Sequence, residues 1–108
     1  MKATPLEMAM LDFFHRKYSK NGFPHPVDVE IVERLNTGSG RRVLLKTPAI
    51  IKGFSGYLDM QGHFIEMDGL EQGLMATVSV DDGAIDELEF SVYGEHVWDG
   101  GEKCWRIV

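Results

Sequence analysis

The chain has 108 residues, a formal net charge of −6 and a single cysteine, Cys104. This length suits one domain, and a hydrophobic content of 44% excludes wholesale disorder. The acidic balance disfavours non-specific binding to phosphate, a single cysteine forms no internal disulfide, and no apolar run is long enough to cross a membrane. We therefore expect one soluble, cytoplasmic domain over residues 1–108.

The first element predicted is an amphipathic helix over about residues 5–20. Thr4 and Glu7 have the spacing of a capping box, and Pro5 suits the first helical turn. Asn21-Gly22 provides the stop signal. The apolar residues at helical spacing are Leu6, Met10, Phe13 and Phe14.

Residues 27–35 fit two periods. Val27, Val29 and Ile31 alternate as in a strand, although a helix would also place apolar residues on one face. The β-branched residues and the flanking prolines favour a strand. Residues 37–40 then predict a hairpin loop into a strand over 43–51, with Leu45 opposite Ile31.

A second hairpin is predicted over 54–60 and 63–67, turning at Gln61-Gly62. The glycines of this region indicate strong bending of the sheet. The chain then ends in a short strand over 103–108, with Trp105 and Ile107 on one face and Cys104 as a packed thiol.

The central feature is a long hairpin over residues 74–93, in which apolar and polar residues alternate. A two-residue loop would place Glu87 opposite Val78 and bring acid to the core. A three-residue loop over 81–83 instead pairs Ala76 with Leu88, so burial favours the longer loop. The side chains predicted on the opposite, outward face are Met75, Thr77, Ile85, Glu87, Glu89 and Tyr93.

These elements predict an α+β fold. An N-terminal amphipathic helix is followed, over about residues 27–108, by a strongly bent, mainly antiparallel sheet of about six strands. A half-open, Sm-like barrel is one form that such a sheet takes.

Residues for catalysis or metal binding do not form a motif. The histidines are scattered, and the sequence predicts no metal, no cofactor and no catalytic residue. The Gly-rich segment before Arg41-Arg42 lacks the GxxxxGK[ST] pattern of a phosphate loop. A small hydrolase or isomerase using His96 and Asp99 is therefore only a third interpretation, and the enzyme question stays open.

Two resemblances bear on function. The helix-then-bent-sheet order, together with 53–59 (GFSGYLD) and 92–94 (VYG), resembles the Sm-like RNA-binding proteins, although no asparagine follows Asp59 and Tyr93 replaces a basic residue. This resemblance implies an RNA-binding homo-oligomer. The candidate nucleic-acid contacts are Arg41, Arg42, Lys52 and His63.

The stretch 83–90 (GAIDELEF), followed by Tyr93-Gly94-Glu95, is similar to the closing strand of small acidic immunity and inhibitor proteins of bacteria and phages. This resemblance implies non-catalytic binding to a protein partner with a basic surface. It is the leading hypothesis, and the candidate protein-binding residues are Glu87, Glu89, Tyr93 and Trp98.

Overall fold

The computed structural model describes residues 1–48, 51 and 54–108. It contains one α-helix, α1 (Pro5–Tyr18), and two 3-10 turns, Ser19–Asn21 and Pro26–Asp28. The strands of the described residues are β1 (Glu30–Asn36), β2 (Gly40–Lys46), β3 (Gly56–Leu58), β4 (Ile65–Met67), β5 (Leu70–Asp81), β6 (Ala84–Val92) and β7 (Arg106–Ile107).

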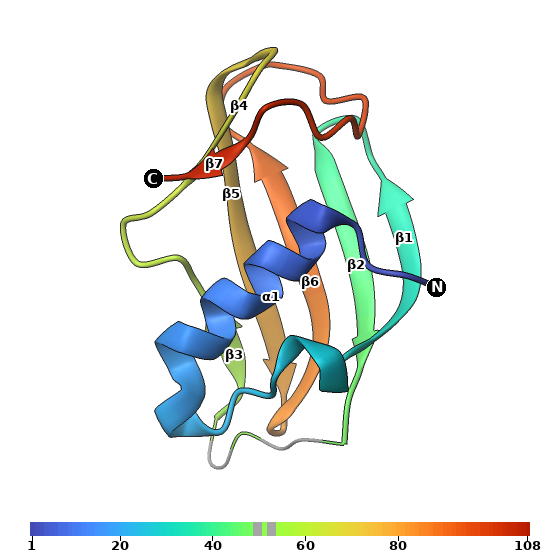
Figure 1. Ribbon diagram of the computed structural model, residues 1–108, viewed down its shortest axis with the longest axis vertical. Helices are drawn as coiled ribbons and strands as arrows, with labels where there is room; N and C mark the ends of the chain where they lie inside the picture. The colour runs from blue at the N-terminus through green and yellow to red at the C-terminus, as the bar shows by residue number, and fades with distance from the viewer. Residues whose placement is uncertain (49–50, 52–53) are drawn as a thin grey trace.

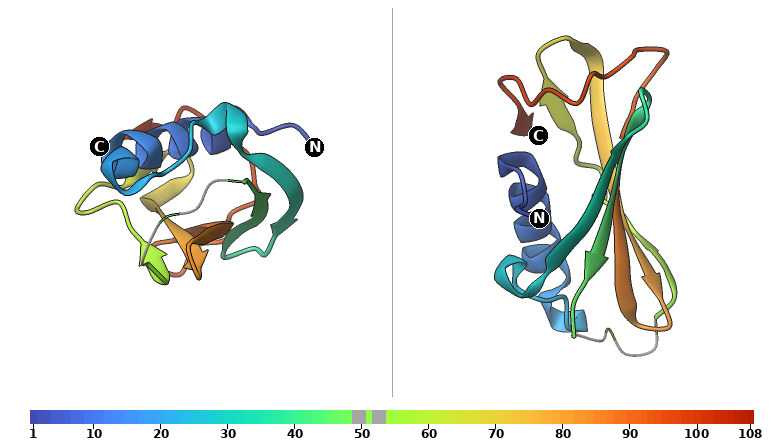
Figure 2. Two further views of the ribbon diagram at one scale, coloured as in Figure 1. Left: turned by 90° about the horizontal axis from the view of Figure 1, so that it is seen from below. Right: turned by 90° about the vertical axis from the view of Figure 1, so that its right-hand side faces the viewer.

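The strands form one antiparallel sheet in the order β1-β2-β6-β5-β4-β7, and β3 also pairs with β5 (Figure 1). The sheet is bent and twisted but does not close into a barrel. Helix α1 lies across one face, whereas no described helix covers the other face (Figure 2). The α+β prediction is confirmed. No helix of the described residues is long and apolar enough to span a membrane.

The hydrophobic core lies between α1 and the inner face of the sheet. The helix contributes Leu6, Met10, Leu11 and Phe14, each without exposed surface. Burying one such side chain contributes about 1.5–3 kcal/mol. The sheet residues with no exposed surface are Val43, Ile65, Leu74, Ala76, Val78 and Leu88.

Helix α1 begins as the sequence predicts. The Glu7 amide donates to the Thr4 hydroxyl at 3.1 Å, and the Thr4 amide donates to the Glu7 carboxylate at 3.0 Å, which completes the capping box. After Tyr18 the chain tightens into a 3-10 turn, which ends at Gly22 with a φ of 93°. The predicted helix over 5–20 is thus α-helical as far as Tyr18.

The strand prediction for 27–35 is confirmed in its second half. Residues Pro26–Asp28 form a 3-10 turn, and β1 begins only at Glu30. The predicted pairing of Ile31 with Leu45 is present. The following strand, β2, ends at Lys46; positions 49 and 50 of the predicted strand over 43–51 lie outside the described residues.

The predicted register of the central hairpin is wrong. The turn is the two-residue Asp82-Gly83, with φ angles of 48° and 83°, and Ala76 pairs with Phe90 rather than Leu88. The longer loop was predicted because a two-residue loop would place Glu87 opposite Val78. A β-bulge in β6 removes this conflict. Because the pairing passes from Ile85 to Glu87, Asp86 is the extra residue, and Leu88 rather than an acid faces Val78.

The predicted hairpin between 54–60 and 63–67 is also wrong, although the chain does turn at Gln61-Gly62. Strands β3 and β4 do not pair with each other. Strand β5 has 12 residues, enough for β3 to pair with its second half and β4 with its first. Both short strands therefore follow one edge of β5.

The C-terminal strand β7 pairs with β4, and Trp105 and Ile107 pack against the core. Cys104 is exposed and not the packed thiol that the sequence predicted. Its backbone has a φ of 46°, so the chain turns at this residue before β7 begins.

Candidate functional site

Six side chains gather on the face of the sheet that α1 leaves uncovered, and we call this group the outer face. They come from the neighbouring strands β2, β6, β5 and β3. The strand register brings them together, since Arg42 and Thr77 both lie opposite Glu89, and Tyr57 lies opposite Ser79. They enclose a shallow hollow of about 170 Å³. The members are Arg42, Tyr57, Thr77, Ser79, Glu87 and Glu89.

The charges of the outer face are partly neutralised within the chain. Arg42 donates from Nε and Nη2 to the two carboxylate oxygens of Glu87, at 2.7 and 3.1 Å. These hydrogen bonds raise the pKa of Arg42. Glu89 lies beside this pair and forms no ion pair with the described residues. One arginine thus lies beside two acids and forms its hydrogen bonds with Glu87, so the three side chains keep a net negative charge.

Tyr57 is the most exposed aromatic residue of this surface, with 74% of its surface accessible. Tyr57 was not among the binding residues predicted from the sequence. A signal was available, because strand alternation turns Tyr57 outward once its neighbour Leu58 is buried. Its exposure, however, follows from the position of β3 at the edge of β5.

The other predicted protein-binding residues lie elsewhere. Tyr93 follows β6 and lines a separate hollow, described below. Trp98 is 3% exposed, so it lies in the core and not on the surface where the sequence placed it. Its Nε1 donates to the Gly101 carbonyl at 2.8 Å, and the Arg41 guanidinium lies 4.7 Å from its ring centroid. Ile85, predicted to face outward, is buried because the bulge at Asp86 changes the alternation.

The predicted nucleic-acid contacts do not share a surface. Neighbours on β2 point to opposite faces, so Arg41 is buried inside while Arg42 lies on the outer face. The Nδ1 of His63 lies 3.1 Å from the Val108 carbonyl oxygen, and its ring packs on Phe13. Lys52 lies outside the described residues.

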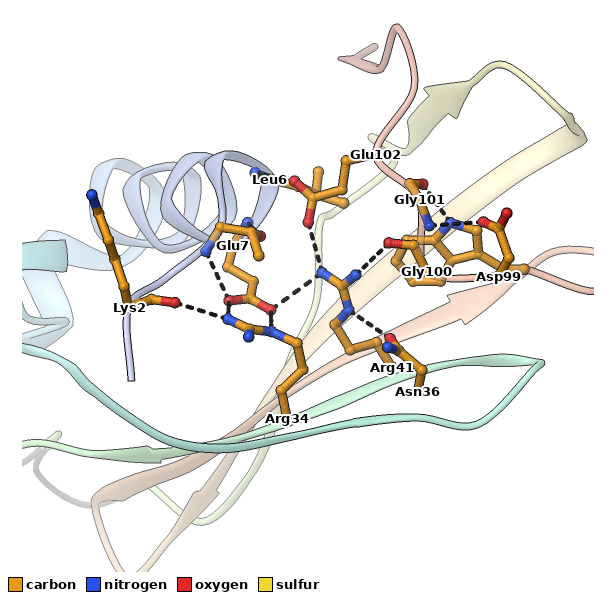
Figure 3. A network of polar contacts seen from close by, with 12 residues as sticks. Lys2, Leu6, Glu7, Arg34, Asn36, Arg41, Asp99, Gly100, Gly101 and Glu102 are labelled. Carbon is orange, nitrogen blue, oxygen red and sulfur yellow. Dashed lines mark hydrogen bonds and ion pairs between the residues drawn. The ribbon is translucent and has the colours of Figure 1, made fainter.

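Arg41 belongs to a buried network of ion pairs at the N-terminal end of α1 (Figure 3). Its Nη1 donates to Glu7 at 3.2 Å and to Glu102 at 2.7 Å, and its Nη2 donates to the Gly100 carbonyl at 2.7 Å. Arg34 donates to the same Glu7 carboxylate from Nε, at 2.6 Å, and from Nη2. Glu7 has no exposed surface and Arg41 is 3% exposed.

This network joins α1, β1, β2 and the C-terminal segment, and its two arginines balance its two acids. Burial raises the pKa of Glu102, but hydrogen bonds from Thr4, Arg41 and the Leu6 amide outweigh this effect and hold the pKa below its ordinary value. Each charged group of the network forms hydrogen bonds with an opposite charge of the same chain. We therefore assign the network to folding and not to ligand binding.

No model of a protein family, no curated protein and no solved structure matches this chain.

The interpretation as an enzyme using His96 and Asp99 gains no geometric support. His96 Nε2 lies 3.6 Å from a Glu71 carboxylate oxygen, whereas Asp99 accepts a hydrogen bond from the Gly101 amide. Across the described ranges, no three histidine, cysteine or acidic side chains gather as metal ligands would.

Proposed function

We propose that this chain is a non-enzymatic protein-binding module, comparable to an inhibitor or immunity protein, and that its outer face binds a basic surface of the partner. The observation that carries the proposal is Tyr57, an aromatic side chain three-quarters exposed beside the unpaired acid Glu89. Tyrosine is enriched at protein interfaces because it combines a large apolar ring with a hydroxyl group that can form hydrogen bonds.

The net charge of the chain also favours a partner with a basic surface. A protein of net charge −6 attracts a basic surface at long range, and Glu89 supplies a specific acidic contact on the outer face. Thr77 and Ser79 add hydroxyl groups between Tyr57 and the acids. The proposal places the chain in the cytoplasm, in agreement with its single exposed Cys104.

The test is an affinity capture with tagged protein from a nuclease-treated lysate of the source cells, followed by a binding titration with each purified captured protein. The variants are Tyr57→Ala and Glu89→Lys. Asp28→Lys is the matched control, because it makes the same charge change on the 3-10 turn beside α1. We expect each outer-face variant to weaken binding about tenfold or more, with the control unchanged.

Salt provides a second readout. Binding through Glu89 weakens as ionic strength rises, and the Glu89→Lys variant loses most of that salt dependence. Equal binding by the wild type and all three variants would refute the proposal. Capture of nucleic acid that depends on Arg42 would instead favour the Sm-like interpretation, and self-association through the same residues would favour a homo-oligomer.

A further inference from the structure

A second hollow, of about 360 Å³, lies at the edge of β5, and we call it the edge pocket. It arises from the strand pairing. Strand β3 pairs with Val78 and Val80, and β4 pairs with Leu70 and Leu74, so neither covers Ala76. Here the segment 59–64 leaves the edge of the sheet as a projecting loop (Figure 1, yellow-green). This loop forms one wall, and β5 with Tyr93 forms the other.

The loop is held in place by the rest of the molecule. The Tyr18 hydroxyl donates to the Asp59 carbonyl at 2.9 Å, and the His63 ring packs on Phe13 with 5.4 Å between the ring centroids. The Gln61 amide donates to the Asp59 carboxylate at 2.9 Å, which closes the turn. Because helix α1 anchors this wall, the pocket exists before any ligand binds, and little ordering is needed on binding.

The lining has two chemical parts. Phe64 and Met75 supply aromatic and thioether surface, and Tyr93 adds a ring that is 40% exposed. Met60, 3% exposed, lies beneath them as the floor of the pocket. Methionine sulfur makes favourable contacts with aromatic rings. Among the described residues that line the pocket, Asp59 alone has a formal charge at pH 7, with histidine counted as neutral.

We propose that the edge pocket binds a small organic cation in which an aromatic ring is joined to an ammonium group. The ring would lie against Phe64, Met75 and Tyr93, and the ammonium group would lie near Asp59. The volume is at the lower end of the range for ligand pockets, which suits one ring with a short chain. The residues that line this site are different from those of the outer face.

Methionine methyl groups provide the readout. Protein carrying ¹³C-methyl methionine is titrated with phenethylammonium, and the methyl resonances are followed by NMR. We expect saturable shifts at Met60 and Met75, with the exposed Met8 unchanged, because Met8 lies on α1 and does not line the pocket. Butylammonium and benzyl alcohol, which lack the ring or the charge, should each bind at least about fivefold more weakly.

Two variants test whether binding depends on the negative charge of Asp59. Asp59→Asn retains an oxygen for the Gln61 amide but removes the charge, and we expect about fivefold weaker phenethylammonium binding. Asp81→Asn, at the β5–β6 turn, is the matched control and should leave the affinity unchanged. Tyr57→Ala should also leave it unchanged, so failure of the proposed function and failure of this proposal are distinguishable.

Three results would overturn the proposal. The first is the absence of saturable shifts at Met60 and Met75. The second is equal affinity for phenethylammonium and benzyl alcohol, or for wild type and Asp59→Asn. The third is binding of the peptide acetyl-Phe-Lys-amide without binding of phenethylammonium, which would assign the pocket to a partner's side chain and not to a free ligand.

Discussion

Glu7 has two roles at one position. It closes the capping box with Thr4, and it accepts hydrogen bonds from Arg34 and Arg41 inside the protein. The first role was predicted because the capping box needs only a spacing of three residues. The second was not, because the arginines lie on β1 and β2, and their approach depends on how α1 crosses the sheet. The burial of Trp98 was not predicted either, because it depends on contacts with Arg41 on β2 and Phe90 on β6.

Replacing Glu7 by glutamine tests the second role. Glutamine retains the oxygen that closes the capping box but leaves two arginines opposite one acid, Glu102. Removal of one partner from a buried ion pair costs about 3 kcal/mol or more, and we expect this loss in the free energy of unfolding measured with urea. Glu33→Gln, at an exposed position on β1, is the control and should change it by less than about 0.5 kcal/mol. Equal losses would contradict a stabilising network.

At the scale of elements, the bulge in β6 determines which residues form the outer face. The alternation predicted Glu87 and Glu89 outward, and the structure agrees, but it predicted Ile85 outward as well. The extra residue Asp86 reverses the orientation of the segment before it. A bulge leaves no simple periodic signal, since its position is set by which cross-strand neighbours bury the most apolar surface.

The pairing of β2 with β6 leads to a prediction for Gly40. A Cβ atom at this position would lie 1.9 Å from the Phe90 carbonyl oxygen, so Gly40→Ala must displace the backbone of β6. Gly38 is the matched control. It lies in the loop that precedes β2, with φ +83° and open space around it, so Gly38→Ala costs about 1–2 kcal/mol of backbone strain alone.

We expect Gly40→Ala to lower the free energy of unfolding by clearly more than Gly38→Ala, at about 3 kcal/mol or above. Thermal unfolding of both variants, followed by circular dichroism, provides the measurement. An effect of Gly40→Ala no larger than that of its control would mean that β2 and β6 are less closely paired than described.

At the scale of the whole molecule, the N-terminal helix and the C-terminal segment depend on each other. The Leu6 amide donates to Glu102 at 3.0 Å, and Arg41 donates to both Glu7 and Glu102. One hydrophobic core also connects α1 to the sheet. A helix joined to the rest by its apolar face and by buried ion pairs has no independent stability.

We therefore predict cooperative, two-state unfolding. In the Trp105→Phe variant, fluorescence reports on the buried Trp98, and far-ultraviolet circular dichroism reports on α1. The two signals should give coincident midpoints in urea. Loss of the helical signal at a lower urea concentration than the Trp98 signal would show that α1 unfolds separately.

The sequence by itself determined the local features. It determined the start of α1, the apolar face of the helix, the strand character of β1 with Ile31 opposite Leu45, and the α+β class. Each depends on a capping motif, a helical or alternating period, or a short loop, all of which act over a few residues.

Only the tertiary structure decided the register of β5 with β6, the placement of β3 and β4 along one edge of β5, and the burial of Glu7. It also decided that Tyr57 and not Trp98 lies on the outer face, and that the loop 59–64 encloses the edge pocket. These outcomes depend on which strands share an edge and which charged groups meet inside. Both are set by burial over the whole sheet, which no local spacing records.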